Sequence, residues 1–384
     1  MNKSSYRIGI DARLFGTRQA AGIGIWVEEL IGHLLKLDKV NQYIAIMLPE
    51  TAEFFPFYAN NLKKQIVRFP HYTYSEQFLY PRILKKMKLD LIHYTNFNTP
   101  IFFKGTKSIV SIYDLTLWFY PGRKQRSWFR RMIYRYVMKK SCENASRIIA
   151  ISNKTKQDII KFINIDPSKI DVVYAAAPKR RKVAIDARRA DQIFSKHNIS
   201  RPFFLYVGQW RQHKNLVRLI RAFALLKRQY NLDYQLVLVG QVDEYASEIP
   251  RVIKQLGLQD SVITTGYISD NNLSIFYDRA EIFVFPSLYE GFGIPPLEAM
   301  SAGTPVISSN ASVMPEVLGD AAVYFDPTNI KDMADTMYKV ASSFTIKKQL
   351  KDKGFKQIKK YSYTKMAREI LAIYKKVLAE PSNT

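Results

Sequence analysis

The chain has 384 residues, of which 47% are hydrophobic, and it carries a net charge of +25. No run approaches the ~20 apolar residues of a membrane span, and Cys142 is the single cysteine, so a membrane-spanning protein and a disulfide-stapled fold are both excluded. The short apolar strand near the N-terminus predicts no secretory leader, and the lone cysteine suits a reducing compartment as an inert core thiol.

Strand patterns alternate with helical patterns through the first half of the chain, which is typical of a parallel sheet. Strands are expected at 7–11, 43–48, 91–93, 108–113, 147–151 and 171–174, with helices over 24–37 and 154–162. Residues 178–202 contain two prolines, eight basic residues and no strand pattern, so a domain boundary is expected near 180–200.

A second alternating series follows. Its strands are expected at 203–207, 234–240, 261–265, 281–285, 305–308 and 322–325, and three helices over 329–342, 344–360 and 362–379 close the chain. This pattern predicts an α/β fold with two Rossmann-like domains, 1–190 and 200–361, and a last helix, 362–384, that packs back onto the first domain.

The charge is uneven between these halves. Residues 1–190 contain 34 Lys or Arg and 14 Asp or Glu, which gives +20, whereas residues 191–384 contain 24 and 19, which gives +5. Such asymmetry predicts an anionic partner for the first half: a membrane surface, a nucleic acid or a phosphorylated substrate.

Residues 286–305 form the most informative segment, because they follow one expected strand and lead into the next. Gly291 and Gly293 permit close backbone approach, and Pro295 or Pro296 suits the first turn of a helix that carries Glu298. A helix N-terminus behind a glycine-bearing loop favours a bound phosphate or diphosphate.

Two carboxylates flank this loop. Glu290 and Glu298 can reach different parts of one extended ligand and accept hydrogen bonds from sugar hydroxyls. The alternative is that Glu298 supports the helix dipole and Glu290 is a solvated loop residue.

The segment reads Pro-Ser-x-x-Glu-Gly-Phe-Gly-x-Pro-x-x-Glu-Ala-Met-x-x-Gly-x-Pro-Val and resembles glycosyltransferase family 4. These are retaining enzymes of the GT-B fold, in which two Rossmann-like domains face a central cleft. The resemblance implies that the domain 1–190 binds the acceptor and the domain 200–361 binds the nucleotide-sugar donor. The resemblance implies that Glu290 contacts the donor hexose and Glu298 the ribose. It also implies further donor-binding residues, namely Gly291, Phe292, Gly293, Ile294, Gly266, Tyr267 and Ile268.

The start of the second domain, residues 206–216, resembles the family's glycine and basic-pair segment. It implies that Gly208 and Lys214 lie at the donor diphosphate, where a lysine stabilises the charge that grows on the leaving group. His213 stands where the family has arginine, and Arg211 is two residues earlier, so either can assist Lys214. The alternative is that Lys214 belongs to a solvated face of the helix that follows and binds no donor.

In the first domain, the resemblance places Gly22 and Gly24 near the donor phosphates, although Gly22 can also be a helix-start glycine. His93, Tyr113 and Asp114 lie at the carboxyl ends of two strands. His93 is either a core or a cleft histidine. Tyr113 replaces the family histidine as a candidate catalytic residue, although it does not change charge near neutral pH.

Residues 118–140 concentrate eight basic residues among large aromatic ones and indicate a basic amphipathic helix. Its expected apolar stripe is Trp128, Phe129, Met132 and Ile133, beside Arg126, Arg130, Arg131 and Arg135. This pattern suits anionic lipid headgroups, with a solvated helix face as the alternative.

These patterns and the family resemblance together predict an enzyme that transfers a hexose from a nucleotide diphosphate sugar to a lipid-linked or oligosaccharide acceptor in polysaccharide or cell-envelope glycan synthesis. The resemblance favours mannose as the sugar and GDP-mannose as the donor. No metal and no cofactor is required, because Lys214 and helix dipoles supply the charge. The expected location is the cytoplasm or the inner face of the cytoplasmic membrane. A sugar-nucleotide epimerase of the same architecture is the alternative. A nucleic-acid-binding protein is disfavoured, because no nucleic-acid module accompanies the charge.

Overall fold

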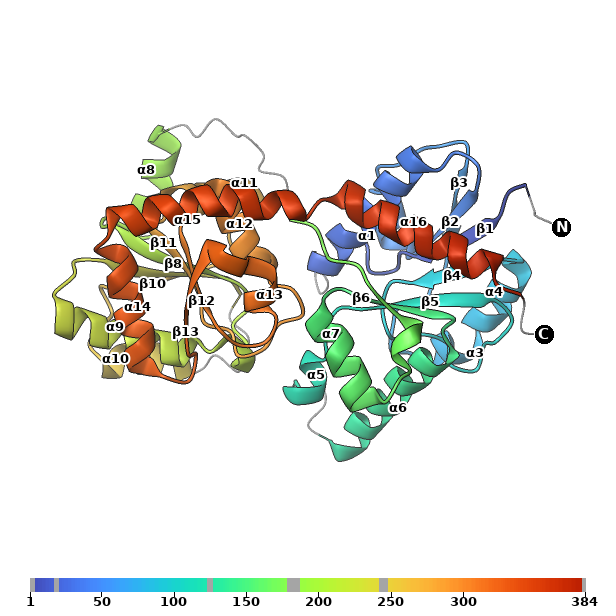
Figure 1. Ribbon diagram of the computed structural model, residues 1–384, viewed down its shortest axis with the longest axis horizontal. Helices are drawn as coiled ribbons and strands as arrows, with labels where there is room; N and C mark the ends of the chain where they lie inside the picture. Colours follow the sequence, from blue (N-terminus) through green and yellow to red (C-terminus); the bar gives the residue numbers. More distant parts are fainter. Residues whose placement is uncertain (1–3, 17–20, 123–126, 178–186, 242–247, 382–384) are drawn as a thin grey trace. The chain divides into compact units, whose positions relative to one another are not determined.

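The computed structural model describes residues 4–16, 21–122, 127–177, 187–241 and 248–381. These divide into two compact units. Unit 1 contains Met1–Ala176 and Tyr361–Thr384, and unit 2 contains Ala177–Lys360. Each unit is a parallel sheet with helices on both faces (Figure 1).

The sheet of unit 1 has seven strands in the order β3-β2-β1-β4-β5-β6-β7, and every pairing is parallel. The strands are β1 (Arg7–Asp11), β2 (Gln42–Met47), β3 (Leu62–Ile66), β4 (Leu91–Tyr94), β5 (Lys107–Ile112), β6 (Arg147–Ala150) and β7 (Ile170–Val172). The direction of strand progression reverses between β1 and β4, so the ligand-binding switch point of this sheet lies there.

The helices of unit 1 cover both faces of this sheet, with α1 and α16 on one face and α6 and α7 on the other (Figure 1). They are α1 (Ala21–Leu37), α2 (Pro49–Ala52), α3 (Tyr74–Phe78), α4 (Tyr80–Met87), α5 (Thr116–Phe119), α6 (Trp128–Asn144), α7 (Asn153–Asp158) and α16 (Tyr363–Ala379). A π-helical turn, Ile159–Ile163, continues α7. No helix in the described ranges is long and apolar enough to cross a membrane.

The last helix, α16, returns to unit 1 and packs against α1. The Tyr374 hydroxyl lies 2.6 Å from His93 Nδ1, and the other ring nitrogen of His93 lies 2.8 Å from Ser111 Oγ. His93 is fully buried, and burial lowers its pKa to about 3. Both ring nitrogens are therefore engaged in the interior, which favours the core interpretation of His93 over the cleft one.

The sheet of unit 2 has six parallel strands in the order β10-β9-β8-β11-β12-β13. The strands are β8 (Phe203–Val207), β9 (Gln235–Val239), β10 (Val262–Gly266), β11 (Ile282–Phe285), β12 (Val306–Ser309) and β13 (Ala322–Phe325). Its helices are α8 (Ala187–Lys196), α9 (Leu216–Tyr230), α10 (Glu248–Gln255), α11 (Asp270–Arg279), α12 (Ile294–Ala302), α13 (Met314–Leu318), α14 (Ile330–Ala341) and α15 (Phe344–Gln357). Here the strand order reverses between β8 and β11.

The division between the units falls after Ala176, earlier than the expected end of the first domain at residue 190. The reason is α8, a helix that the sequence did not signal. Its Phe194 ring meets Phe203 and Phe276 edge to face, at 5.7 and 5.4 Å between centroids, so α8 belongs to the second core.

Two further elements differ from expectation. The strand β3 was not predicted, because Leu62–Ile66 is a partly exposed edge strand with two lysines rather than an apolar run. The helix expected within 118–140 begins only at Trp128, after the separate short helix α5, because Pro121 lies between them and cannot continue a helix. Arg126, which was expected beside the apolar stripe, lies outside the described residues.

Cys142 is buried on α6, as expected for a core thiol. Burial raises its pKa to about 12, so the reactive thiolate form is suppressed at neutral pH.

Candidate functional site

The strongest candidate site lies at the switch point of unit 2, where loops leave the carboxyl ends of β8 and β11. Lys214 follows β8 and Glu290 follows β11. Their side chains meet, with Lys214 Nζ 2.6 Å from Glu290 Oε1, and they are only 15% and 13% exposed. Two predicted site residues that stand 76 positions apart in the sequence thus form one ion pair.

Asn215 ties these loops together. It adopts a left-handed conformation, with φ of 62°, and its Nδ2 donates to the carbonyls of Pro286 at 3.1 Å and Pro327 at 2.8 Å. The amide of Leu288 also donates to the carbonyl of His213 at 2.8 Å. These bonds fix the loop that carries Lys214 against the loop that carries Glu290.

Glycines let neighbouring loops approach closely at this edge of the sheet. Gly208 follows β8 and Gly240 follows β9 with φ of 144°, and a Cβ built on Gly240 would lie 1.9 Å from the Gly208 carbonyl oxygen. Any larger residue at position 240 would push the β8 loop, and Lys214 with it, out of place.

The predicted phosphate-binding loop ends at Gly293, which precedes α12 and has φ of 90°. This left-handed conformation favours glycine, and a Cβ there would also lie 2.5 Å from Met314 Cε and displace the end of that side chain. Pro295 and Pro296 have no amide hydrogen, so Ile294 carries the one amide among the first three residues of α12. Recognition of a ligand by main-chain groups would therefore depend mostly on the loop 291–294 rather than on the helix.

Glu298 lies on α12, and the Tyr277 hydroxyl donates to its Oε2 at 2.7 Å. Burial raises the pKa of Glu298, and the hydrogen bond from Tyr277 offsets part of this effect. Tyr277 itself is buried and comes from α11, so it positions the carboxylate from the neighbouring helix. The sequence patterns did not predict this contact.

The two candidates for assisting Lys214 differ in charge. His213 is 5% exposed, and burial, followed by Lys214 and Arg211, lowers its pKa to about 3. His213 is therefore neutral at physiological pH and contributes no positive charge there. Arg211 is exposed and stands just before the 3-10 turn Gln212–Lys214, so it is the better candidate for the second cation.

The remaining predicted donor residues of unit 2 lie at the same edge of the sheet. Gly266 ends β10 with φ of 71°, and Tyr267 beside it is 70% exposed, followed by the half-buried Ile268. They are separated from the β8 loop by β9, so they extend the candidate site along the sheet edge rather than contribute to the Lys214–Glu290 pair.

The predicted residues of unit 1 lie in diverse environments. Gly22 is exposed with open space around it, whereas a Cβ on Gly24 would lie 3.0 Å from the Leu14 carbonyl, so Gly24 has a packing role. Asp114 lies two residues before α5 and accepts a hydrogen bond from the amide of Thr116, the first residue of that helix, at 2.6 Å. No metal-ligating group of three His, Cys, Asp or Glu side chains occurs within the described ranges.

Tyr113 turns its hydroxyl into the interior. Its ring meets Trp26 of α1 edge to face at 5.4 Å between centroids, and its hydroxyl is buried with no hydrogen-bond partner among the described residues. Burial raises the pKa of Tyr113 well above its ordinary value. It therefore keeps its proton at neutral pH, which argues against acid–base chemistry at this position.

The switch point of unit 1 holds a buried ionic cluster that sequence reasoning missed. Arg13 Nη2 lies 2.6 Å from Asp11 Oδ2 and 2.7 Å from Glu76 Oε1, and all three side chains are fully buried or nearly so. Burial acts to raise the pKa of Asp11, but Arg13 outweighs it and holds that pKa below its ordinary value. The only sequence signal was two opposite charges, Asp11 and Arg13, at the end of an apolar strand.

Comparison with known families covers most of the chain. A family model described as glycosyl transferases group 1 matches residues 188–357, and a model described as glycosyltransferase family 4 matches residues 22–181. The first contains the whole unit 2 site, including Lys214, Glu290 and Glu298.

Two relatives share substantial identity with the chain. It is 31% identical over 260 residues to the O-antigen chain mannosyltransferase RfbU of Salmonella typhimurium, which covers 68% of this chain and 67% of RfbU. It is 30% identical over 245 residues to the serotype-specific mannosyltransferase WbdA of Escherichia coli. That match covers 63% of this chain but spans less than a third of WbdA, 30% of its length.

Among solved structures, the sucrose-phosphate synthase of Thermosynechococcus elongatus superposes with a TM-score of 0.75, covering 97% of this chain and 99% of that one. The identity is 19%, so this likeness shows the fold alone. The predicted fold class, α/β with two Rossmann-like domains of the GT-B type, is confirmed.

Replacing Gly240 with alanine tests the close approach that holds the β8 loop. We expect Gly240→Ala to lower the free energy of unfolding by roughly 3 kcal/mol or more, because the methyl group collides with the Gly208 carbonyl. Gly257→Ala is the matched control, since Gly257 also has a positive φ, 66°, but has open space, so it should cost only about 1 kcal/mol. Urea denaturation followed by circular dichroism measures both, and equal losses would contradict the steric account.

Proposed function

We propose that this chain, which belongs to glycosyltransferase family 4, transfers mannose from GDP-mannose to a lipid-linked or oligosaccharide acceptor during the assembly of a polysaccharide or cell-envelope glycan. The mannosyltransferase relatives RfbU and WbdA support transfer of mannose rather than the epimerase alternative. The observation that carries the proposal is the Lys214–Glu290 pair beside the glycine loop at the unit 2 switch point.

Lys214 is the group that stabilises the leaving diphosphate. Its ammonium is 15% exposed and fixed at the edge of the sheet, where a charge acts more strongly than it does in bulk water. Without a donor, Glu290 balances this charge at 2.6 Å. When the diphosphate arrives, Lys214 exchanges its carboxylate partner for phosphate oxygens, and Glu290 becomes available to accept hydrogen bonds from the hexose hydroxyls.

The two carboxylates and the loop divide the donor between them. Glu290 binds the hexose, the backbone groups of 291–294 line the sugar and diphosphate, and Glu298 binds the ribose. One oxygen of Glu298 is held by Tyr277, which leaves the other to accept a hydroxyl. Arg211 supplies the second positive charge, so the reaction requires neither a metal ion nor a cofactor.

The acceptor hydroxyl attacks the face from which the diphosphate leaves, so the anomeric configuration is retained. In this step the bond between the anomeric carbon and the phosphate oxygen breaks, a bond to the acceptor oxygen forms, and the acceptor proton passes to the departing diphosphate. No nucleophile from the enzyme takes part in this reaction.

A panel of nucleotide sugars tests the donor assignment. We expect GDP-mannose to raise the melting temperature more than UDP-glucose or GDP-fucose, because a ligand at 100 times its dissociation constant adds about 2.7 kcal/mol to the native state. Replacing Lys214 with methionine should remove most of this stabilisation and lower kcat/KM for transfer by about 100-fold or more.

The matched control for this variant is Lys331→Met. Lys331 also forms an ion pair in unit 2, with Asp335 at 2.6 Å, but it is 67% exposed and lies on α14. The Lys331→Met variant should show the same stabilisation by GDP-mannose and the same kcat/KM as the unaltered chain. Full donor stabilisation and turnover in Lys214→Met, or a product of inverted configuration, would refute the assignment.

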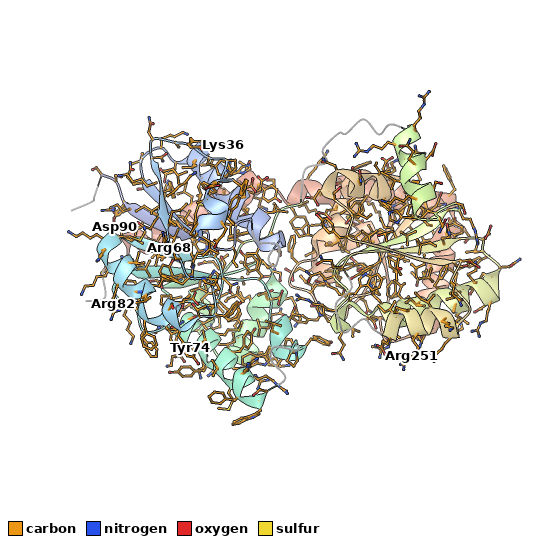
Figure 2. The ribbon with its side chains drawn as sticks, turned by 180° about the vertical axis from the view of Figure 1, so that it is seen from behind. Lys36, Arg68, Tyr74, Arg82, Asp90 and Arg251 are labelled. Carbon is orange, nitrogen blue, oxygen red and sulfur yellow. The ribbon has the colours of Figure 1, made fainter. Side chains whose placement is uncertain are left out.

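We further propose that α6 holds the protein at the inner face of the cytoplasmic membrane. The helix has two apolar faces: Tyr134 and Met138 point into the core, whereas Trp128, Phe129, Met132, Ile133 and Tyr136 are 46–70% exposed on roughly the opposite side. Arg130 and Arg131 are exposed on the same helix, and Arg135 stacks on Trp118 at 4.5 Å. Figure 2 shows further outward side chains of unit 1, including Tyr74, which is 87% exposed, and Arg82.

Co-sedimentation with vesicles tests this contact. Vesicles of phosphatidylcholine that contain phosphatidylglycerol should bind the chain, and added salt should weaken that binding. Trp128→Ser should weaken it by about tenfold, since one buried apolar side chain contributes roughly 1.5–3 kcal/mol. Phe344→Ser, a change at a 77% exposed side chain of unit 2, is the control and should bind normally. Equal binding by both variants would rule out α6 as the contact.

A further inference from the structure

A cavity of about 480 Å³ opens in unit 1, and its lining includes no residue of the buried ionic cluster, of α6 or of the predicted site. Its walls come from the segments that follow three adjacent strands: Phe15 and Gly16 after β1, Glu50 and Phe54 near α2 after β2, and Arg68 after β3. The cavity therefore lies at the carboxyl edge of the sheet, where α/β units bind ligands. Its volume falls in the range of about 300–1,000 Å³ that small-molecule sites occupy.

Phe15 forms a buried, packed wall of the cavity. Phe15 is 5% exposed, and its ring meets Phe55 edge to face at 5.2 Å between centroids. Gly16 follows with φ of 66°, and a Cβ there would come within 3.2 Å of the Thr51 methyl group. Glycine thus keeps this side of the cavity open, while Phe54, which is 77% exposed, offers an aromatic face to it.

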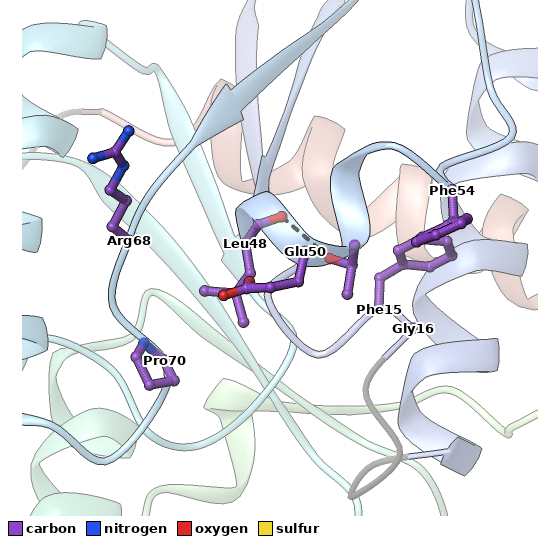
Figure 3. A pocket seen from close by; sticks show the side chains of 8 residues that line it. Phe15, Gly16, Leu48, Glu50, Phe54, Arg68 and Pro70 are labelled. Carbon is purple, nitrogen blue, oxygen red and sulfur yellow. Dashed lines mark hydrogen bonds between the residues drawn. The ribbon is translucent and has the colours of Figure 1, made fainter.

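Two opposite charges line the cavity without neutralising each other. Neither Glu50 nor Arg68 forms a hydrogen bond or an ion pair with any described residue, and both are exposed. In Figure 3, Glu50 reaches from α2 toward the middle of the view, with Arg68 and Pro70 to one side and Phe15 and Phe54 to the other. A carboxylate acceptor and a guanidinium donor are thus available to one ligand.

This combination selects a class of ligand. An anion would be attracted by Arg68 but repelled by Glu50, and an alkyl chain would form no hydrogen bond with either group. A neutral sugar satisfies all the groups, because its hydroxyls donate to Glu50 and accept from Arg68 while its apolar face packs on Phe54 or Phe15. We propose that this cavity is a subsite for one or two neutral sugar residues of the acceptor glycan, and this inference rests on the proposed transferase function.

Disaccharide binding in solution tests the subsite without requiring turnover. The probes are α-mannobiose, maltose and lactose, observed by saturation-transfer NMR on the full chain. At least one should give a signal, and Glu50→Gln and Phe54→Ser should each reduce it strongly. The matched controls are Glu53→Gln, which changes a neighbouring exposed carboxylate outside the cavity lining, and Tyr58→Ser, which changes an 85% exposed aromatic.

In transfer assays, Glu50→Gln should raise the KM for the acceptor by about tenfold while kcat and stabilisation by GDP-mannose stay unchanged. Glu53→Gln should change none of these. The absence of a signal with every disaccharide, or the same behaviour of Glu50→Gln and Glu53→Gln, would overturn the subsite. Failure of the donor assignment is distinguishable, because it removes stabilisation by nucleotide sugars and leaves the disaccharide signal and its dependence on Glu50 intact.

Discussion

The contact between Lys214 and Glu290 is the interaction on which the site of unit 2 depends. It joins the loops after β8 and β11, which are neighbours in space because these two parallel strands are adjacent in the sheet. A half-buried lysine and carboxylate stabilise each other only while both are present, so either one alone would be an unpaired charge. The pair holds the Lys214 ammonium at the sheet edge before the donor binds. An incoming diphosphate can then replace the Glu290 carboxylate as the partner of Lys214.

The charged residues at the switch points of the two units differ in their exposure, although both sheets are parallel and reverse their strand order once. In unit 1 the position is filled by Arg13, which is fully buried between Asp11 and Glu76. A ligand could reach those charges only by breaking a cluster from which water is excluded. In unit 2 the corresponding charges remain partly exposed and border a loop that glycine shapes. This contrast supports a donor site in unit 2, whereas unit 1 offers an open cavity at the β1–β3 side of its sheet.

Sequence patterns predicted the six strands of unit 2 well, because most of them are apolar runs bounded by turn residues. They failed for β3, a partly exposed edge strand with lysines, and for α8, whose membership of the second core depends on Phe276, far along the chain. The motif identified Glu290, Glu298 and Lys214 as site candidates. The pairing of Glu290 with Lys214 depends on strand order, and that of Glu298 with Tyr277 depends on helix packing. The spacing of residues in the sequence encodes neither. The environment of His93 likewise depends on Tyr374, 281 residues later.

A crystal structure with GDP-mannose bound is the most direct measurement of the central claim. The account predicts the diphosphate beside the backbone of 291–294, with Lys214 Nζ moved from Glu290 to the phosphate oxygens and Glu290 on the hexose hydroxyls. A donor bound elsewhere, with the Lys214–Glu290 distance unchanged at 2.6 Å, would contradict it.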